Sequence, residues 1–164
     1  MVEGTKTGKL LLLKQSLHII DLDQITSSKP QYQGVHFLTT SISPENEHHP
    51  FAESLAGKGN YMTFGDAKLI ICMKLGDGSY YVAFGTYLPE DWVAQHSTLA
   101  KDPAALRDWI LKEQLADWPE LRRDLIKYSD GNFRPWPLVA MPKESIPWKT
   151  VPGVALIGDA AHCT

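Results

Sequence analysis

The stretch "NYMTFGDAKLIICMKLGDGSYYVAFGTYL" (Asn60–Leu88) decides the fold class. It holds three runs rich in β-branched and aromatic residues, and the runs are separated by Gly65–Asp66 and by "LGDGS" (75–79). Two such runs joined across a short glycine-containing turn are the sequence pattern of a β-hairpin. The stretch therefore predicts consecutive antiparallel strands in a sheet that packs one face and leaves the other available.

The residues before this stretch add a strand and a small helix. Residues 32–42, "YQGVHFLTTSI", are rich in β-branched and aromatic residues and alternate well enough to predict another strand. A polar loop, "SPENEHHP" (43–50), follows this strand. Residues 51–59, "FAESLAGKG", then resemble a short helix that ends at glycine.

The residues after the hairpins change to a helical pattern. Asp102 is a candidate N-cap and Pro103 stands at the first helical position, so a helix is expected from about Pro103 to Ala116. In "DWPELRRDLIKY" (117–128) apolar residues recur three and four positions apart. This spacing predicts a second helix after a break near Pro119.

The last third of the chain returns to strands. In "FRPWPLVAMP" (133–142), Pro135 and Pro137 exclude a helix interior and favour an edge strand. The order of strands, two helices and strands predicts an α+β fold with a largely antiparallel sheet and two helices. A final short strand at 154–157 leads into a turn of the kind that open α/β domains use to hold ligands.

Composition excludes some classes of partner. The chain has 164 residues, 43% hydrophobic and 21% charged, with a net charge of −3, so it lacks the basic balance of a nucleic-acid-binding protein and we expect no membrane partner. The apolar run Leu10–Leu13 is broken by Lys14, so we expect no signal peptide. Cys72 and Cys163 lack CxxC spacing and fit a reducing compartment. We therefore expect a soluble, cytoplasmic protein that binds small molecules or proteins.

The C-terminal residues "VALIGDAAHCT" (154–164) read as a strand, a Gly-Asp turn and a helix start. Gly158 allows a ligand to approach the backbone closely, and the Asp159 carboxylate can accept hydrogen bonds from hydroxyl groups. Ala160 and Ala161 keep the helix start slim, where free amides favour a phosphate. The turn fits a ribityl or ribose unit beside a phosphate, or alternatively a purely local helix N-cap.

These residues also carry a family resemblance. "LIGDAAH" (156–162) resembles the second flavin-binding motif of the class A FAD-dependent monooxygenases, the aromatic hydroxylase group. Residues 133–162 resemble the strand, crossover and return strand that lead into this motif. Residues 59–92 resemble the substrate-domain hairpins, most closely those of the tetracycline-inactivating, TetX-like branch. The resemblance covers roughly residues 32–164.

The resemblance implies a cofactor site and a substrate site. Asp159 would bind the ribityl chain of FAD, Gly158 and Ala160 would line the cofactor, and His162 would lie beside it. Tyr61 and Tyr81, expected on adjacent hairpin strands, become candidate substrate contacts, or alternatively half-buried aromatics of the sheet.

The same resemblance implies the chemistry. FAD with NADPH or NADH as reductant would hydroxylate an aromatic or polycyclic small molecule through a flavin hydroperoxide, without a protein nucleophile or a metal.

Departures from the family pattern set the expected domain organisation. The sequence has no GxGxxG, and residues 1–31 do not resemble the family. We therefore expect an unmatched segment at 1–31, a substrate-binding α+β domain at 32–149, and an incomplete part of the FAD-binding domain at 150–164. Such a fragment would hold FAD poorly alone, and a separate chain could supply the missing half. A non-catalytic binding module and an inactive or unstable truncated product remain alternatives.

Other groups of residues are less specific. His48 and His49, with Glu45 and Glu47, could ligate a metal, but adjacent histidines in a polar loop favour a solvated loop. Asp159 and His162 lack a nucleophile in a recognisable turn, which argues against a hydrolase. Arg122 and Arg123 are expected on the solvated face of their helix, opposite its apolar stripe.

Overall fold

The computed structural model describes residues 11–12, 28–145 and 154–155. The chain divides into two compact units, one formed by Gly34–Leu138 and the other by Met1–Gln33 together with Val139–Thr164. The first of these units carries the sheet and the helices that position the candidate site.

The smaller unit contains a short parallel pair of strands. β1 (Leu11–Leu12) pairs with β7 (Val154–Ala155), with Leu11 opposite Val154. The predicted final strand is thus present over its first residues, and its partner comes from the segment that showed no resemblance to the family. Residues 156–164, which include the predicted flavin motif, lie outside the described residues.

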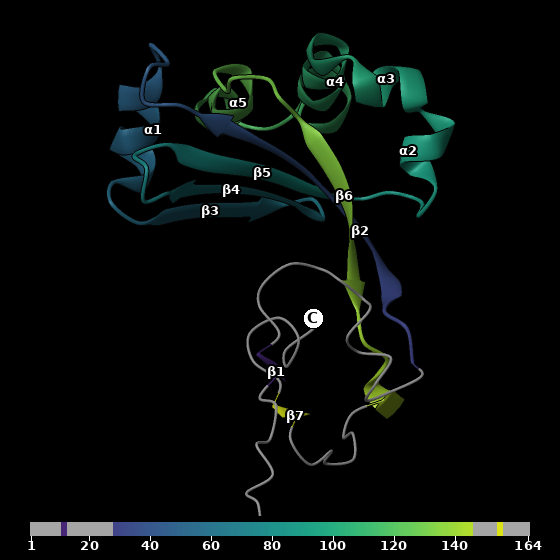
Figure 1. Ribbon diagram of the computed structural model, residues 1–164. Coiled ribbons are helices and arrows are strands. Elements are labelled where there is room, and N and C mark those ends of the chain that lie inside the picture. Colours follow the sequence, from purple (N-terminus) through teal and green to yellow (C-terminus); the bar gives the residue numbers. More distant parts are fainter. Residues whose placement is uncertain (1–10, 13–27, 146–153, 156–164) are drawn as a thin grey trace, which may run out of the picture. The chain divides into compact units, whose positions relative to one another are not determined.

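A five-stranded sheet forms the centre of the larger unit (Figure 1). The strand order is β3-β4-β5-β2-β6, and the pairs β3–β4, β4–β5 and β5–β2 are antiparallel. β6 lies at one edge, as the two prolines predicted, and β3 lies at the other. The strands are β2 (Gln31–Ile42), β3 (Asn60–Gly65), β4 (Lys68–Lys74), β5 (Tyr80–Tyr87) and β6 (Arg134–Ala140).

The β3–β4 turn differs by one residue from the sequence prediction. Gly65 pairs with Lys68, so the turn consists of Asp66 and Ala67, with φ angles of 48° and 56°. Positive φ at both central residues is the geometry of a type I′ hairpin turn, which matches the twist of the strands. Asp tolerates this conformation, whereas Ala normally avoids it, because its Cβ meets the following carbonyl oxygen.

Helices gather on one side of this sheet (Figure 1). The short helix expected at 51–59 and the two helices expected after residue 102 are present, and the structure has further helical segments, because the stretch 92–101 forms two short helices that show no long apolar stripe in the sequence. The segments are α1 (His49–Ala56), α2 (Trp92–Gln95), α3 (Ser97–Lys101), α4 (Pro103–Trp109), the π-helix η2 (Ile110–Gln114), α5 (Glu120–Lys127) and the 3₁₀ helix η3 (Lys143–Ser145).

The N-terminus of α4 confirms the predicted cap. The Asp102 side chain accepts hydrogen bonds from the backbone N–H groups of Ala104 and Ala105, both at 3.0 Å. The helix does not continue regularly to Ala116, because it turns into a π-helix at Ile110. Leu115 N–H then donates to the Ile110 carbonyl at 2.9 Å, one residue further along than in an α-helix.

The hydrophobic core lies between the helices and one face of the sheet. Alternate strand residues such as Leu38, Ile70 and Phe84 are fully buried there, together with Leu106 and Ile126 from the helices. Burying each such side chain stabilises the fold by about 1.5–3 kcal/mol. The buried thiol of Cys72 belongs to the same core, and burial raises its pKa to about 11.

A carboxylate ties two loops of this unit together. Asp130, after α5, accepts hydrogen bonds from the Ser41 hydroxyl, from the backbone and hydroxyl of Ser43, and from the side-chain amide of Asn46. The backbone N–H of Asp130 in turn donates to the Ser41 carbonyl at 2.8 Å. The end of β2 is thereby fixed against the segment that leads into β6.

Candidate functional site

The face of the sheet opposite the core is the candidate site, and we call it the open face. Its side chains alternate with the core residues along each strand, and the strand pairing places them side by side. Several are large and apolar, and Phe64 and Tyr87 are 67% and 65% exposed. The open face comprises Val35, Phe37, Thr39, Ser41, Met62, Phe64, Leu69, Ile71, Met73, Tyr81, Ala83, Gly85 and Tyr87, with Trp136 stacked on it.

A pair of stacked aromatic rings marks the β6 side of the open face. Phe37 and Trp136 have ring centroids 4.9 Å apart and planes inclined by 21°. Gly85, directly opposite Phe37 on β5, makes room for the Phe37 ring. A Cβ at Gly85 would lie 2.9 Å from an edge carbon of that ring, closer than atoms approach without a shift. The absence of a side chain at Gly85 therefore allows Phe37 to stack on Trp136.

Tyr81 lies beside this stack and is held by it. Burial raises the pKa of Tyr81, and hydrogen bonds with the side chains of Trp136 and Thr39 partly oppose the shift. Thr39 in turn donates from Oγ1 to the backbone carbonyl of Arg134 at 3.2 Å. The tyrosine is therefore partly buried among its neighbours on the open face.

A shallow groove of about 370 Å³ crosses one end of the open face. The strained Asp66–Ala67 turn forms part of its rim, and Lys68 and Asp66 are the charged side chains that line it. The remaining wall is mainly apolar, so the groove suits a flat apolar group. It is lined by Val35, Phe37, Phe64, Gly65, Asp66, Ala67, Lys68, Leu69, Gly85, Thr86, Tyr87 and Leu138.

Tyr61 and Tyr81, the two candidate substrate contacts, do not lie next to each other in the structure. β4 lies between β3 and β5, so Tyr61 and Tyr81 are not on adjacent strands as expected. Tyr61 pairs with Cys72 and packs against the core, whereas Tyr81 pairs with Met73 on the open face. The difference arises from register, because neighbouring positions along a strand point to opposite faces.

The predicted cofactor residues cannot be placed in this geometry. Gly158, Asp159, Ala160 and His162 lie outside the described residues. Phe37 and Trp136 were not singled out in the sequence, although "RPWPL" (134–138) holds a tryptophan between two prolines, which is a signal of a fixed aromatic on an edge strand.

The two candidate metal histidines have other neighbours. His48 stacks on Tyr128 with ring centroids 3.9 Å apart, and His49 Nε2 lies 2.9 Å from the Gly78 carbonyl. Among residues 28–145, no group of three or more His, Cys, Asp or Glu side chains is arranged to hold a metal ion. Within the described part of the chain, no helix is both long and apolar enough to cross a membrane.

Comparison with known proteins finds one curated relative in sequence and several solved structures that share the fold. No family model matches the chain. Monooxygenase asqM of Emericella nidulans is 22% identical over 167 residues, which cover 81% of this chain and 37% of asqM.

Two solved structures share the fold. HpxO of Klebsiella pneumoniae, complexed with FAD and uric acid, superposes with a TM-score of 0.57 at 23% identity, covering 82% of this chain and 31% of HpxO. A putative FAD-containing monooxygenase of Photorhabdus luminescens superposes with a TM-score of 0.53 at 17% identity, covering 83% of this chain and 39% of that one.

The α+β fold read from the sequence is thus confirmed, and part of HpxO and part of the putative FAD-containing monooxygenase have the same fold. The chain spans between 31% and 39% of the length of these three proteins. The narrower resemblance to the TetX-like branch stays a prediction.

Proposed function

We propose that this chain forms the substrate side of an FAD-dependent monooxygenase, with the open face as a wall of the substrate pocket. The observation that carries the proposal is an apolar sheet face, with Phe64, Tyr87 and Trp136 exposed, on a fold that proteins crystallised with FAD share. Exposed apolar patches of this kind mark binding sites. The substrate would be an aromatic or polycyclic small molecule.

The described residues of the open face fit a flat, apolar ligand. Trp136 is 39% exposed although its ring stacks on Phe37, so part of the indole is available to a further ring. Offset stacking of one more aromatic ring on such a pair is favourable. Tyr81 contributes its ring to the same wall, because it lies on the open face beside Trp136 and Thr39. Tyr61 packs against the core, so any effect of this residue on the substrate would be indirect, through its support of β3.

The residues proposed to hold FAD come from the resemblance. Asp159 would accept hydrogen bonds from the ribityl hydroxyls, Gly158 and Ala160 would line the cofactor, and His162 would lie beside it. When bound and reduced by NADPH or NADH, FAD supplies the oxygen-activating chemistry. The residues of the open face would orient the substrate and exclude water, and no side chain described here needs to act as a nucleophile.

A flavin titration of the full chain tests this proposal. FAD fluorescence should be quenched on binding, and Asp159→Ala should weaken binding by about tenfold or more, because a charge-assisted hydrogen bond is lost. Asp117→Ala is the matched control, since Asp117 is an exposed aspartate far from the motif in sequence, and it should bind FAD as the unaltered chain does.

The substrate wall is tested separately by Trp136→Ala. Binding of a planar aromatic probe such as uric acid, followed by calorimetry, should be lost in Trp136→Ala and retained in Leu121→Ala, which removes an apolar side chain that is 54% exposed on α5. A folded chain that binds neither FAD nor an aromatic probe would contradict the proposal.

A further inference from the structure

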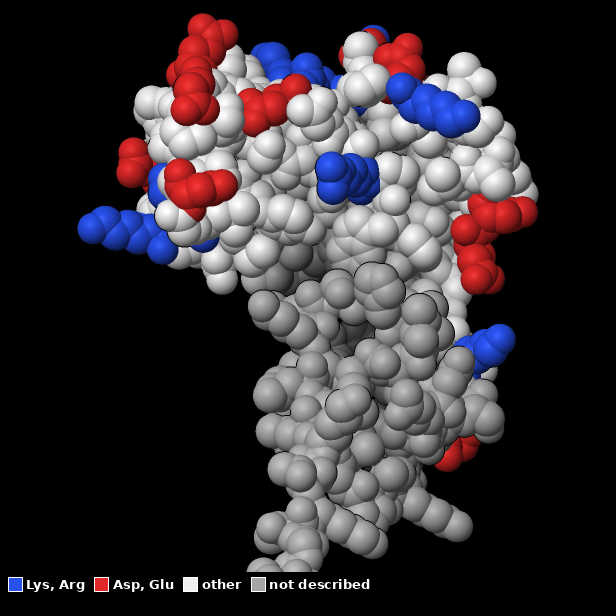
Figure 2. Space-filling view, in the orientation of Figure 1, with Lys and Arg blue, Asp and Glu red and all other residues white. Residues whose placement is uncertain are grey.

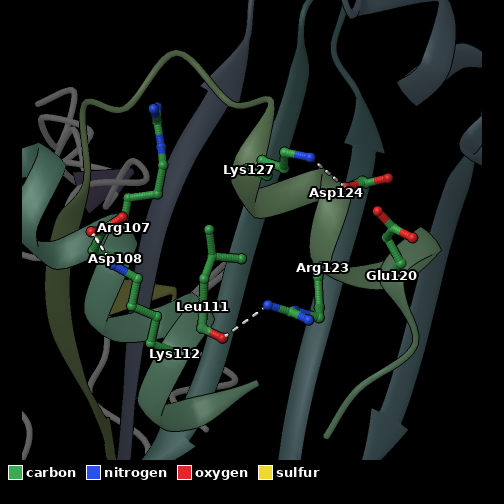
Figure 3. Close-up of a pocket in the computed structure, with 8 residues that line it drawn as sticks. All are labelled: Arg107, Asp108, Leu111, Lys112, Glu120, Arg123, Asp124 and Lys127. Carbon is green, nitrogen blue, oxygen red and sulfur yellow. Dashed lines mark hydrogen bonds and ion pairs between the residues drawn. The ribbon is translucent and has the colours of Figure 1, made fainter. Parts of the chain in front are cut away.

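A second hollow lies on the helical layer, between α4 with η2 on one side and α5 on the other (Figure 3). It measures about 660 Å³ and is lined almost entirely by charged side chains. We call it the helix hollow. Its lining consists of Arg107, Asp108, Leu111, Lys112, Glu120, Arg123, Asp124 and Lys127.

The charges in the helix hollow do not cancel. Four of the lining side chains are basic and three are acidic, which leaves a net charge of +1 in a chain whose net charge is −3. On the face shown in Figure 2, acidic and basic side chains are scattered among uncharged ones. The hollow therefore concentrates positive charge where the chain as a whole is acidic.

The two lysines of the hollow already have partners. Lys112 Nζ lies 2.7 Å from Asp108 and Lys127 Nζ lies 3.8 Å from Asp124, each within one helical turn. The two arginines form no ion pair within the described residues, and Glu120 is the lining carboxylate that is not paired there. The unbalanced charge of the hollow therefore resides on Arg107 and Arg123.

Arg123 is the arginine whose hydrogen bonds are least satisfied. Its Nη2 reaches across the hollow to the Leu111 carbonyl in the π-helical turn, at a long 3.4 Å (Figure 3). Its Nε is buried and has no hydrogen-bond partner. This position corrects the sequence expectation of a solvated Arg123, and it leaves a buried cationic donor without an acceptor, which folded proteins usually avoid.

Arg107 lines the hollow from α4, on the side opposite to Arg123. Its Nη2 donates to the Ser129 carbonyl at 2.6 Å, and its Nε is also buried without a partner. A Cβ on Gly131 would lie 2.5 Å from that Nη2, so the glycine makes room for the guanidinium. Arg107 is therefore fixed in place, whereas Arg123 is held only by its long bond to Leu111.

We propose that the helix hollow binds a phosphate-type oxyanion through Arg123, with Arg107 as a second basic residue in its lining. The Nε and Nη2 groups of a guanidinium form a fork that matches two oxygens of a phosphate. An incoming oxyanion would replace the weak contact to Leu111 and supply the acceptor that Nε lacks. This site lies among the helices rather than on the open face, and it goes beyond the proposed function.

Inorganic phosphate is the probe, added to the full chain at constant ionic strength. Phosphate should raise the melting temperature and bind in a saturable way by calorimetry. Arg123→Gln should weaken binding by about tenfold or more, because a charge-assisted pair of hydrogen bonds is lost. Arg123→Lys should fall between, since it keeps the charge without the fork. Glu120→Gln should tighten binding, because it removes the unpaired carboxylate.

Arg122→Gln is the matched control, because it removes the same charge from the neighbouring position of α5. The Arg122 guanidinium lies 5.9 Å from the Trp118 ring and does not line the hollow. Phosphate binding should survive in this variant. Adenosine monophosphate, tested beside inorganic phosphate, distinguishes the source: tighter binding of the nucleotide indicates a nucleotide phosphate, and equal or weaker binding indicates free phosphate.

The readout is the phosphate-dependent shift within each variant, so a change in basal stability does not obscure it. Circular dichroism confirms that each variant is folded. Equal loss of binding in Arg122→Gln and Arg123→Gln would show non-specific attraction and overturn the proposal, as would a folded, unaltered chain that phosphate does not stabilise.

Discussion

The two faces of the central sheet are built from similar residues but differ in what covers them. On the core face, Leu38, Ile70 and Phe84 are completely buried beneath the helices. On the open face, residues as apolar as Phe64 and Tyr87 are more than half exposed. The same alternating strands thus supply a stabilising face and a binding face, and the helical layer decides which is which.

The largest expected effect on stability comes from replacing a phenylalanine on each face of the sheet by alanine. Phe84→Ala should lower the free energy of unfolding by about 3–5 kcal/mol, because it leaves a cavity between Leu38 and Ile70. Phe64→Ala, on the open face, should change it by less than about 0.5 kcal/mol. Denaturant unfolding measures both, and a similar loss in the two variants would refute the division into faces.

A smaller effect is expected at Gly85, where the open face has an internal packing requirement. Gly85→Ala should destabilise the chain by about 1–3 kcal/mol, because its methyl group displaces the Phe37 ring from Trp136. Near-ultraviolet circular dichroism should report the loss of the stack. Gly76→Ala is the control, since a Cβ there meets no atom within 4 Å and should leave spectrum and stability nearly unchanged.

Acid should act on the core face through His36. This side chain is 1% exposed, and burial lowers its pKa below 6.5, an effect that Glu90 partly offsets. The unfolded chain therefore binds more protons below pH 6.5, so stability is complete above that pH and declines as the pH falls through the folded pKa. In His36→Gln, the free energy of unfolding should fall less steeply as the pH is lowered below 6.5. If it falls as steeply as in the unaltered chain, groups other than His36 cause the loss of stability in acid.

The smallest effect is expected at the β3–β4 turn, on the rim of the open-face groove. Ala67→Gly should raise the free energy of unfolding by about 0.5–1 kcal/mol, because glycine adopts a φ of 56° without the strain of a Cβ. Ala105→Gly on α4 should have the opposite sign. Thermal unfolding of the two variants measures both effects. Destabilisation by both substitutions would mean that the turn is not strained.

The sequence predicted the elements that depend on local chemistry. The β-prone runs gave the strands, Asp102 gave the start of α4, and Pro135 and Pro137 gave the edge strand β6. The helical segments at 92–101 were missed because each is shorter than two turns. The π-helical turn after Trp109 was missed as well, because it depends on packing rather than on a residue type.

The candidate site was harder to predict because it depends on register and on distant partners. A turn centred on Asp66–Ala67, instead of Gly65–Asp66, gives every β3 residue a different direct partner on β4. Tyr61 and Tyr81 were separated because β4 lies between their strands and because the two residues fall on opposite faces of the sheet in the observed pairing. Phe37 and Trp136 are almost a hundred residues apart, and only the sheet order β5-β2-β6 brings their rings together.

β3, at the edge of the sheet, has a consequence for handling the protein in solution. Its outer backbone groups have no strand partner among the described residues, and Met62 and Phe64 stand exposed along it. Such an edge is a template on which another chain can add a strand, which leads to aggregation. Lys58 and Lys68 flank the strand and oppose this by charge repulsion. Concentrated samples should therefore stay clear longest at low ionic strength, where that repulsion is least screened.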